Sequence, residues 1–208
     1  MKGFTLIELS VTIFILMLLL GIVFNFNAFN KDFFYLKEFS RKLNTAFGIA
    51  NFLAQQTKTY QNQTVCAYGI YFPNNTSYET LAFTTSTLAC DYVVNTNLQN
   101  FLNNNLASKK YVHSNLEIRS NPLPKLALKD TLERGSIIFS TNQNCSPPIN
   151  PPLLFMYIYS YTDMYFLYQQ AGSQWQRIQS PSVYLCLNFR NDHVKIKVNQ
   201  TGQFYIIE

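Results

Sequence analysis

The N-terminal stretch MKGFTLIELSVTIFILMLLLGIVFNFNAFN, residues 1–30, decides the fold. No charged side chain occurs between Leu9 and Phe24. A helix over residues 4–24 is about 30 Å long at ~1.5 Å per residue, which matches the hydrocarbon core of a bilayer. The pattern therefore predicts an N-terminal helix that can cross a membrane once.

Two ordinary kinds of segment share this apolar pattern, a cleaved secretory signal peptide and a plain signal anchor. A cleaved signal peptide needs small residues after its apolar run, and here Phe26-Asn27-Ala28-Phe29 follow. Glu8 fits neither kind well, because a carboxylate near the centre of a membrane costs about 2.5–3.5 kcal/mol on insertion scales. It needs a cationic partner, and the nearest cations are Lys2 or an α-amino group made by cleavage.

The segment Gly3-Phe4-Thr5-Leu6-Ile7-Glu8 resembles the class III signal of type IV prepilins and pseudopilins. In that family a short basic leader ends in Gly, the next residue is usually Phe, and the fifth mature residue is Glu. The match is specific because the leader length, the Gly-Phe pair and the spaced Glu coincide within one apolar run. A signal anchor with an accidental Glu is the alternative.

The resemblance implies that prepilin peptidase removes Met1–Gly3 and N-methylates Phe4. It also implies that Glu8 pairs with the Phe4 ammonium of a neighbouring subunit, which makes both buried charges tolerable and sets the axial register. The implied partners are this peptidase, other pilin or pseudopilin subunits, an inner-membrane assembly platform and the membrane itself.

An amphipathic helical pattern continues through residues 25–56. Charged residues such as Lys31, Asp32 and Arg41 separate the apolar positions, and residues 4–56 contain no Pro. The predicted stripe, with spacings of three, four or seven, is Phe29, Phe33, Leu36, Leu43, Phe47, Ala50 and Ala54. Many family members carry a kinking Pro at the twenty-second mature position, where this chain has Asn25.

Residues 57–208 have the alternation and turn residues of short strands. Two hairpins are predicted, one from 153–161 and 164–170 and one from 183–189 and 194–198. Further predicted strands are 65–72, 78–84, 116–119, 136–140, 175–178 and 204–207, while 98–106 is ambiguous. One long helix followed by many antiparallel strands predicts an α+β fold.

The domain organisation follows from these patterns: a leader at 1–3, a transmembrane or assembly helix at 4–24, an amphipathic helix at 25–56 and a β-rich globular head at 57–208. The chain is 13% charged and carries a formal net charge of +5. This charged fraction is about half the usual ~25% of a soluble domain. The modest excess of basic residues does not by itself identify a binding partner.

The chain has four cysteines, Cys66, Cys90, Cys145 and Cys186, all beyond the apolar run. An even number in an oxidising compartment predicts two disulfides, for which three pairings exist. We favour Cys66–Cys90 with Cys145–Cys186, since each closes a shorter section of chain. Four reduced thiols are the alternative. A zinc site is disfavoured because the chain has no C-x-x-C spacing and only two His.

No catalytic, cofactor or metal motif is recognisable. His113 and His193 are far apart in sequence, and His193 falls in a predicted hairpin turn. Lys109, Lys110, Arg190, Lys195 and Lys197 could form a basic patch for DNA, although alternation makes Lys195 and Lys197 the outward face of a strand. The first predicted hairpin also carries alternating tyrosines, a pattern that favours half-buried packing in a sheet over an exposed binding surface for a partner subunit or ligand. They are Tyr157, Tyr159, Tyr161, Tyr165 and Tyr168.

The C-terminal hairpin and the turn Asn199-Gln200-Thr201-Gly202 are similar to those of minor pilins of the GspH/FimT type, as is 66–72. The function that the resemblance implies is that of a non-enzymatic structural subunit, a minor pilin or pseudopilin of a type IV pilus or a type II secretion pseudopilus. Such a subunit is a single-pass protein of the cytoplasmic (inner) membrane with an extracytoplasmic head. The alternative is a DNA-binding or adhesive minor pilin of an uptake or attachment apparatus.

Overall fold

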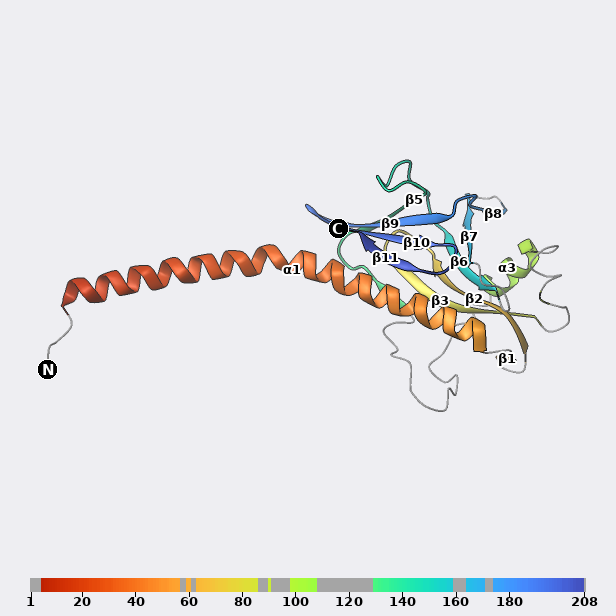
Figure 1. The fold of residues 1–208 in the computed structure, drawn as a ribbon, viewed down its shortest axis with the longest axis horizontal. Coiled ribbons are helices and arrows are strands. Elements are labelled where there is room, and N and C mark those ends of the chain that lie inside the picture. The colour runs from red at the N-terminus through yellow and green to blue at the C-terminus, as the bar shows by residue number, and fades with distance from the viewer. Residues whose placement is uncertain are drawn as a thin grey trace.

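A computed structural model of the chain describes residues 5–56, 59–60, 63–85, 90, 98–107, 129–158, 164–170 and 174–207, without the side chains of 23–30, 56, 59, 60, 63 and 107. The fold is a long N-terminal helix followed by a β-rich head (Figure 1). The first half of the helix projects away from the head and the second half lies along it. The predicted α+β class is confirmed.

The helix α1 spans Leu6–Gln56 as one element of 51 residues. It continues through Asn25, the position at which many members of the resembled family have a kinking Pro, because Asn25 keeps the backbone N–H that a Pro would remove. Beyond residue 30 the predicted stripe faces the head, and Leu36, Leu43 and Phe47 are buried. Phe33 is partly buried against the same core, whereas Phe29 lies outside the described side chains.

The strands form two antiparallel sheets. Sheet A has the order β4-β3-β2-β6-β7-β8, with β1 paired to β2, and sheet B has the order β11-β10-β9-β5. The bounds of the strands in sheet A are β1 Thr59–Tyr60, β2 Gln63–Phe72, β3 Ser77–Thr85, β4 Lys129–Thr131, β6 Leu153–Ile158, β7 Met164–Gln169 and β8 Trp175–Arg177. Those in sheet B are β5 Ser136–Ser140, β9 Ser182–Phe189, β10 Asp192–Asn199 and β11 Phe204–Ile207.

Both predicted hairpins are present, as β6–β7 and β9–β10. The ambiguous segment is a helix, α3 (Leu98–Ala107), in which Leu98, Phe101, Leu102 and Leu106 fall on one face. The predicted strand at 116–119 lies outside the described residues. The turn that precedes β11 is closed by the Gly202 N–H, which donates to the Asn199 carbonyl at 2.9 Å, and Gly202 supplies the φ of +77° that the turn requires.

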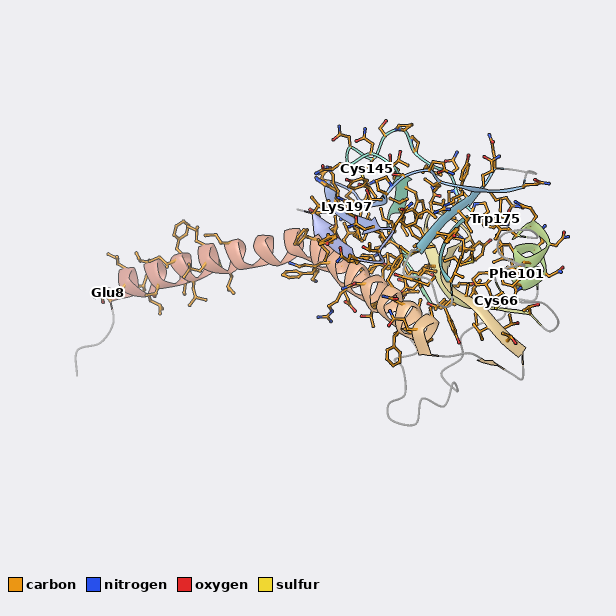
Figure 2. The ribbon with its side chains drawn as sticks, turned by 45° about the vertical axis from the view of Figure 1, so that its right-hand side comes forward. Glu8, Cys66, Phe101, Cys145, Trp175 and Lys197 are labelled. Carbon is orange, nitrogen blue, oxygen red and sulfur yellow. A yellow bond between two sulfur atoms is a disulfide. The ribbon has the colours of Figure 1, made fainter. Side chains whose placement is uncertain are left out.

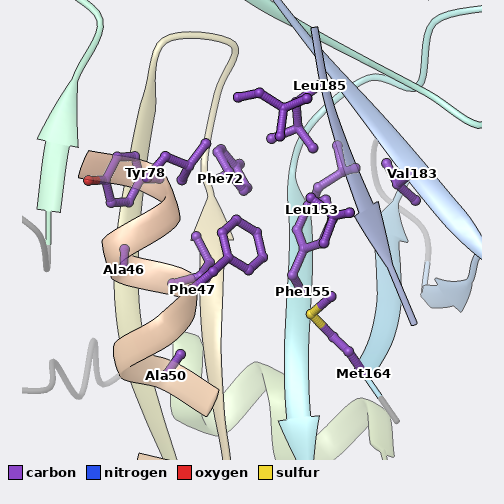
Figure 3. Close-up of a cluster of buried hydrophobic side chains, with 14 of the residues drawn as sticks. Ala46, Phe47, Ala50, Phe72, Tyr78, Leu153, Phe155, Met164, Val183 and Leu185 are labelled. Atoms are coloured by element: carbon purple, nitrogen blue, oxygen red, sulfur yellow. The ribbon is translucent and has the colours of Figure 1, made fainter. Parts of the chain in front are cut away.

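The main core lies where α1 meets both sheets (Figure 3). Phe47 projects from α1 and packs edge-to-face on Phe155 of β6, with 5.4 Å between the ring centroids. Phe72 of β2 contacts Phe155 as well as Phe139 of β5, so one cluster of rings joins the helix to sheet A and sheet B. The second half of α1 therefore packs along one side of the head and shares its core.

A second core lies on the opposite face of sheet A, under α3. It contains Phe83, Phe101, Met156 and Trp175. Because sheet A is covered on both faces, every residue of β6 is buried, which explains why its sequence LLFMYI is continuously apolar instead of alternating.

Two amide side chains of α3 bond backbone groups at unpaired edges of β3 and β8. Asn105 accepts a hydrogen bond from the Thr84 N–H at 2.8 Å and donates to the Thr84 carbonyl at 3.2 Å. Gln99 does the same to the N–H and carbonyl of Trp175 on β8. Each amide thus takes the place of a neighbouring strand, which satisfies backbone groups at a sheet edge.

Polar contacts fix α1 in register with both sheets. Lys42 is 3.1 Å from Asp130 of β4, and Asp32 is 3.1 Å from Arg190 in the β9–β10 turn. The carboxylates of Asp130 and Glu38 more than offset the burial of Lys42, and the pKa of its ammonium is raised. These pairs are partly exposed and contribute orientation more than stability.

Replacement of Asn105 by Ala should destabilise the head. The change removes a buried amide and leaves the Thr84 N–H and carbonyl without that partner, which costs roughly 1–3 kcal/mol. Asn104→Ala on the exposed face of α3 is the matched control and should change the free energy of unfolding by less than about 0.5 kcal/mol. Urea denaturation of both variants measures the difference, and equal stabilities would contradict the strand-like role of Asn105.

Candidate functional site

The first half of α1 is a bare apolar rod. Its large apolar side chains range in exposure from 46% at Leu20 to 86% at Leu6, on all sides of the helix. The exposed set is Leu6, Ile7, Leu9, Val11, Ile13, Phe14, Ile15, Leu16, Met17, Leu18, Leu19, Leu20 and Ile22. Such an uninterrupted apolar surface requires a cover of lipid or protein, because water is a poor solvent for it.

Glu8 lies at the free end of this rod, far from the head (Figure 2). Its Oε2 accepts hydrogen bonds from the Thr5 N–H and the Thr5 hydroxyl, both at 2.9 Å. The Glu8 N–H in turn donates to Thr5 Oγ1 at 3.4 Å. Since the helix begins at Leu6, this is a reciprocal N-terminal capping box with Thr5 as the cap.

The sequence-based analysis did not identify Thr5 as part of this site. The signal that could have found it is Thr-x-x-Glu directly before an apolar run, which is the sequence pattern of a capping box. The cap holds the Glu8 side chain against the first turn of the helix. Thr5 therefore positions the carboxylate.

The hydroxyl groups that follow Glu8 bond within the helix. Ser10 donates to the Ile7 carbonyl at 2.9 Å, and Thr12 donates to the Glu8 carbonyl at 2.8 Å. These bonds reduce the cost of placing hydroxyls in an apolar environment. Glu8 is then the only ionisable side chain from Thr5 to Asn30.

The predicted cleavage residues Gly3 and Phe4 lie outside the described residues, just before this cap. Residues 1–24 match the family model of the prokaryotic N-terminal methylation motif. This match supports a type IV pilin-like protein. The motif implies processing by prepilin peptidase and assembly with other pilin subunits, and it points to a structural subunit.

No curated protein and no solved structure matches the pilin-like chain. Among the residues that the structure describes, no helix combines the length and the apolar character needed to cross a membrane.

The cysteines of the pilin-like chain form the pairing that we favoured from the sequence. Cys66 of β2 is bonded to Cys90, with 5.0 Å between the Cα atoms, and Cys145 is bonded to Cys186 of β9, with 6.3 Å. The first disulfide ties Cys90 to the second core, and the second ties the loop after β5 to the middle of sheet B. Within the described part of the chain, no cluster of His, Cys, Asp and Glu could hold a metal ion.

The basic residues of the C-terminal hairpin are arranged as the alternation predicted. Val194, Ile196 and Val198 are buried, while Lys195 and Lys197 point outward. Arg190 differs from these lysines because it forms an ion pair with Asp32 of α1. His193 is exposed, and His113, Lys109 and Lys110 lie outside the described residues.

The tyrosines of the β6–β7 hairpin support the packing interpretation where they are described. Tyr157 is buried, and Tyr165 and Tyr168 are partly buried. Burial raises the pKa of the Tyr157 hydroxyl above its ordinary value. Tyr159 and Tyr161 lie outside the described residues.

Replacement of Phe47 by Ala should loosen the second half of α1 from the head. Phe47 is 1% exposed, and removal of a buried Phe ring typically costs about 3–5 kcal/mol. Phe52→Ala is the matched control, because Phe52 belongs to the same helix and is 44% exposed. Thermal unfolding should show a large decrease in the melting temperature for Phe47→Ala and a small decrease for Phe52→Ala. Comparable decreases would contradict the burial of Phe47 between the helix and the head.

Proposed function

We propose that this pilin-like chain is a minor pilin or pseudopilin of the GspH/FimT type, which assembles through α1 into a type IV pilus or a type II secretion pseudopilus. The observation that carries the proposal is the methylation motif at residues 1–24 on an apolar helix that the head leaves uncovered. In such an assembly the bare rods of neighbouring subunits cover one another, while the heads form the outer surface.

Processing is the first step of this function. Prepilin peptidase cuts the bond between Gly3 and Phe4 and methylates the new amino group of Phe4. The leader at residues 1–3 carries Lys2, so cleavage replaces the basic leader by a single ammonium directly before the Thr5–Glu8 cap. The new N-terminus and the anchored carboxylate then lie at the same end of the helix.

Before assembly the subunit is held in the cytoplasmic membrane as a single-pass protein with its head outside. Residues 4–24 form the spanning segment, residues 25–56 join it to the head, and residues 57–208 form the head. Two disulfides in the head support an extracytoplasmic location, because such bonds persist in oxidising compartments.

Glu8 sets the axial register between neighbouring subunits in the filament. A carboxylate buried among apolar helices is costly when unpaired, and a neighbouring Phe4 ammonium neutralises it across the subunit interface. The capping box supports this role, because it holds the Glu8 carboxylate at the helix end where the neighbouring N-terminus arrives. An assembly platform in the inner membrane presents subunits to the growing filament.

The subtype rests on the C-terminal part of the head. The β9–β10 hairpin and the turn at Asn199–Gly202 resemble the terminal hairpin and turn of minor pilins of the GspH/FimT type. Their position beside α1 supports a role of this sheet in orienting the head on the helix.

Mass spectrometry of the mature chain tests the processing. Expression with prepilin peptidase should give an N-terminal peptide that begins with N-methylated Phe4, and expression without the peptidase should leave Met1–Gly3 in place. Gly3→Val is the control that should block cleavage. An intact N-terminus in the presence of the active enzyme, or cleavage beyond Phe24, would overturn the proposal.

Replacement of Glu8 by Val should leave membrane insertion intact and lower incorporation into filaments by about tenfold or more, which corresponds to ~1.4 kcal/mol. The change leaves the Phe4 ammonium unpaired among apolar helices. Thr12→Val, one turn further along, is the matched control and should assemble normally. Immunoblots of sheared filament and membrane fractions provide the measurement, and normal incorporation of Glu8→Val would refute the ion pair.

A further inference from the structure

The rod leaves the head beside a small apolar surface that the core does not cover. In the described part of the chain beyond the rod, large apolar side chains are exposed at Phe34, Phe52, Tyr205 and Ile206. Phe34 is 64% exposed and lies where α1 reaches the head, and Ile206 is 43% exposed on the edge strand β11. Figure 1 shows β11 beside α1, which it contacts.

Phe33 joins these exposed residues into one surface. Its ring contacts the Phe34 ring edge-to-face, with 6.4 Å between the centroids. Phe33 also lines a small recess with Ile206. Ile206 pairs in register with the buried Ile196, so its side chain is on the face of sheet B that α1 covers. The neck patch, as we call this surface, consists of Phe33, Phe34, Lys37, Ile206 and Ile207.

Lys37 is the cation of the neck patch. Its Nζ lies over the Phe33 ring, 5.7 Å from the centroid, and its side chain is exposed. Among the residues that the structure describes, Lys37 has no carboxylate partner, while Asp32 on the same helix is paired with Arg190. Whatever covers the neck patch must therefore offer an anionic acceptor beside apolar groups.

The length of the uncharged sequence relates the neck patch to the membrane surface. This sequence continues beyond the spanning segment 4–24, and residues 9–30 are 22 residues without an ionisable side chain. As a helix they are about 33 Å long, close to the ~30 Å of a hydrocarbon core. A bilayer that covers them places Glu8 at one surface, where a carboxylate costs less. It places Phe33 and Phe34 about 5 Å beyond the opposite edge of the core, within a headgroup layer ~5–8 Å thick.

The composition of the neck patch suits the boundary between lipid and water. Aromatic rings are favoured at the level of the headgroups, and a Lys side chain lays its apolar stem on lipid while its ammonium reaches the phosphates. Headgroup phosphates supply the anion that Lys37 lacks, and the glycerol end of the acyl chains can contact Phe34 and Ile206. Lys31 is exposed one turn before Phe34 and adds a second cation at this level.

The rod of a second copy suits the neck patch less well. Beyond Glu8 the rod has no ionisable side chain as far as Asn30. It could cover Phe34 and Ile206, but it would leave the Lys37 ammonium in an apolar contact without an anion. In the proposed filament Glu8 itself is already paired with a neighbouring Phe4 ammonium. A phospholipid surface matches both the apolar and the charged part of the neck patch.

We propose that the neck patch docks on the headgroup layer of the membrane that the rod crosses, with the Lys37 ammonium at a lipid phosphate. The inference rests on the proposed single-pass insertion of α1. Docking holds the head against the membrane surface before the subunit enters a filament.

Fluorescence quenching of the full chain in vesicles of phosphatidylcholine and phosphatidylglycerol tests the docking. The single native tryptophan, Trp175, is replaced by Phe, and one new tryptophan is placed at an exposed apolar position. Ile206→Trp should be quenched by a phospholipid with a nitroxide on its headgroup. Phe14→Trp, in the rod, should be quenched by a phospholipid brominated in its acyl chains. Phe52→Trp lies about 27 Å further along α1 than Phe34 and should be quenched by neither lipid.

Charge reversal tests the role of Lys37. Lys37→Glu should lower the headgroup quenching of Ile206→Trp by about twofold or more, because lipid phosphates repel the new carboxylate. Arg177→Glu is the matched control, since it makes the same change of charge at an exposed position on β8, on the side of the head remote from the rod (Figure 1). It should leave the quenching unchanged, and thermal unfolding checks that both variants are folded.

The probes separate failure of the docking from failure of membrane insertion. If the brominated lipid does not quench Phe14→Trp, the insertion itself is wrong and the docking falls with it. If Phe14→Trp is quenched but Ile206→Trp is not quenched by the headgroup nitroxide, insertion stands and the docking is overturned. Protection of Ile206→Trp from both the nitroxide and aqueous iodide would show a protein cover, such as a second copy, and would also overturn it. Undiminished quenching in Lys37→Glu would overturn the role assigned to Lys37.

Discussion

The apolar stripe of α1 from Leu36 to Ala54 holds the two sheets together. Phe47 reaches the ring cluster of Phe72 and Phe155, which in turn contacts sheet B through Phe139. Without this helix, apolar residues of both sheets that pack against it would be exposed. The same continuous helix carries the bare rod, so no linker separates the rod from the head. Polar pairs at Asp32 and Lys42 set the rotation of the helix on the head.

The two halves of α1 form one continuous α-helix and differ only in what covers their side chains. Backbone hydrogen bonds continue from Leu6 to Gln56, and the helix needs no break where it leaves the head. After Glu8 the next charged residue is Lys31, at the start of the half that packs on the sheets. The capping box at Thr5 and Glu8 then closes the free end, where the first N–H groups would otherwise lack partners.

Much of the fold could be predicted because its signals are local. The hairpins β6–β7 and β9–β10 follow from apolar runs around polar turns, and the outward direction of Lys195 and Lys197 follows from alternation. The helical character of α3 was ambiguous because Asn-rich sequences have weak propensity, and it is fixed by burial of Phe101 and Leu102 and by the Asn105 contact with Thr84. The disulfide pairing was one of three alternatives, since spacing alone does not bring sulfur atoms together.

The sequence by itself determined the apolar rod, the position of Glu8 within it, the amphipathic stripe and most strands, since each depends on a period of a few residues. Only the tertiary structure decided the division into two sheets, the burial of sheet A on both faces and the neck patch that joins Phe33 to Ile206. These features join residues far apart in the chain, such as Gln99 with Trp175 and Cys145 with Cys186. Contacts of that kind depend on how the shared core around α1 closes, and no local period encodes them.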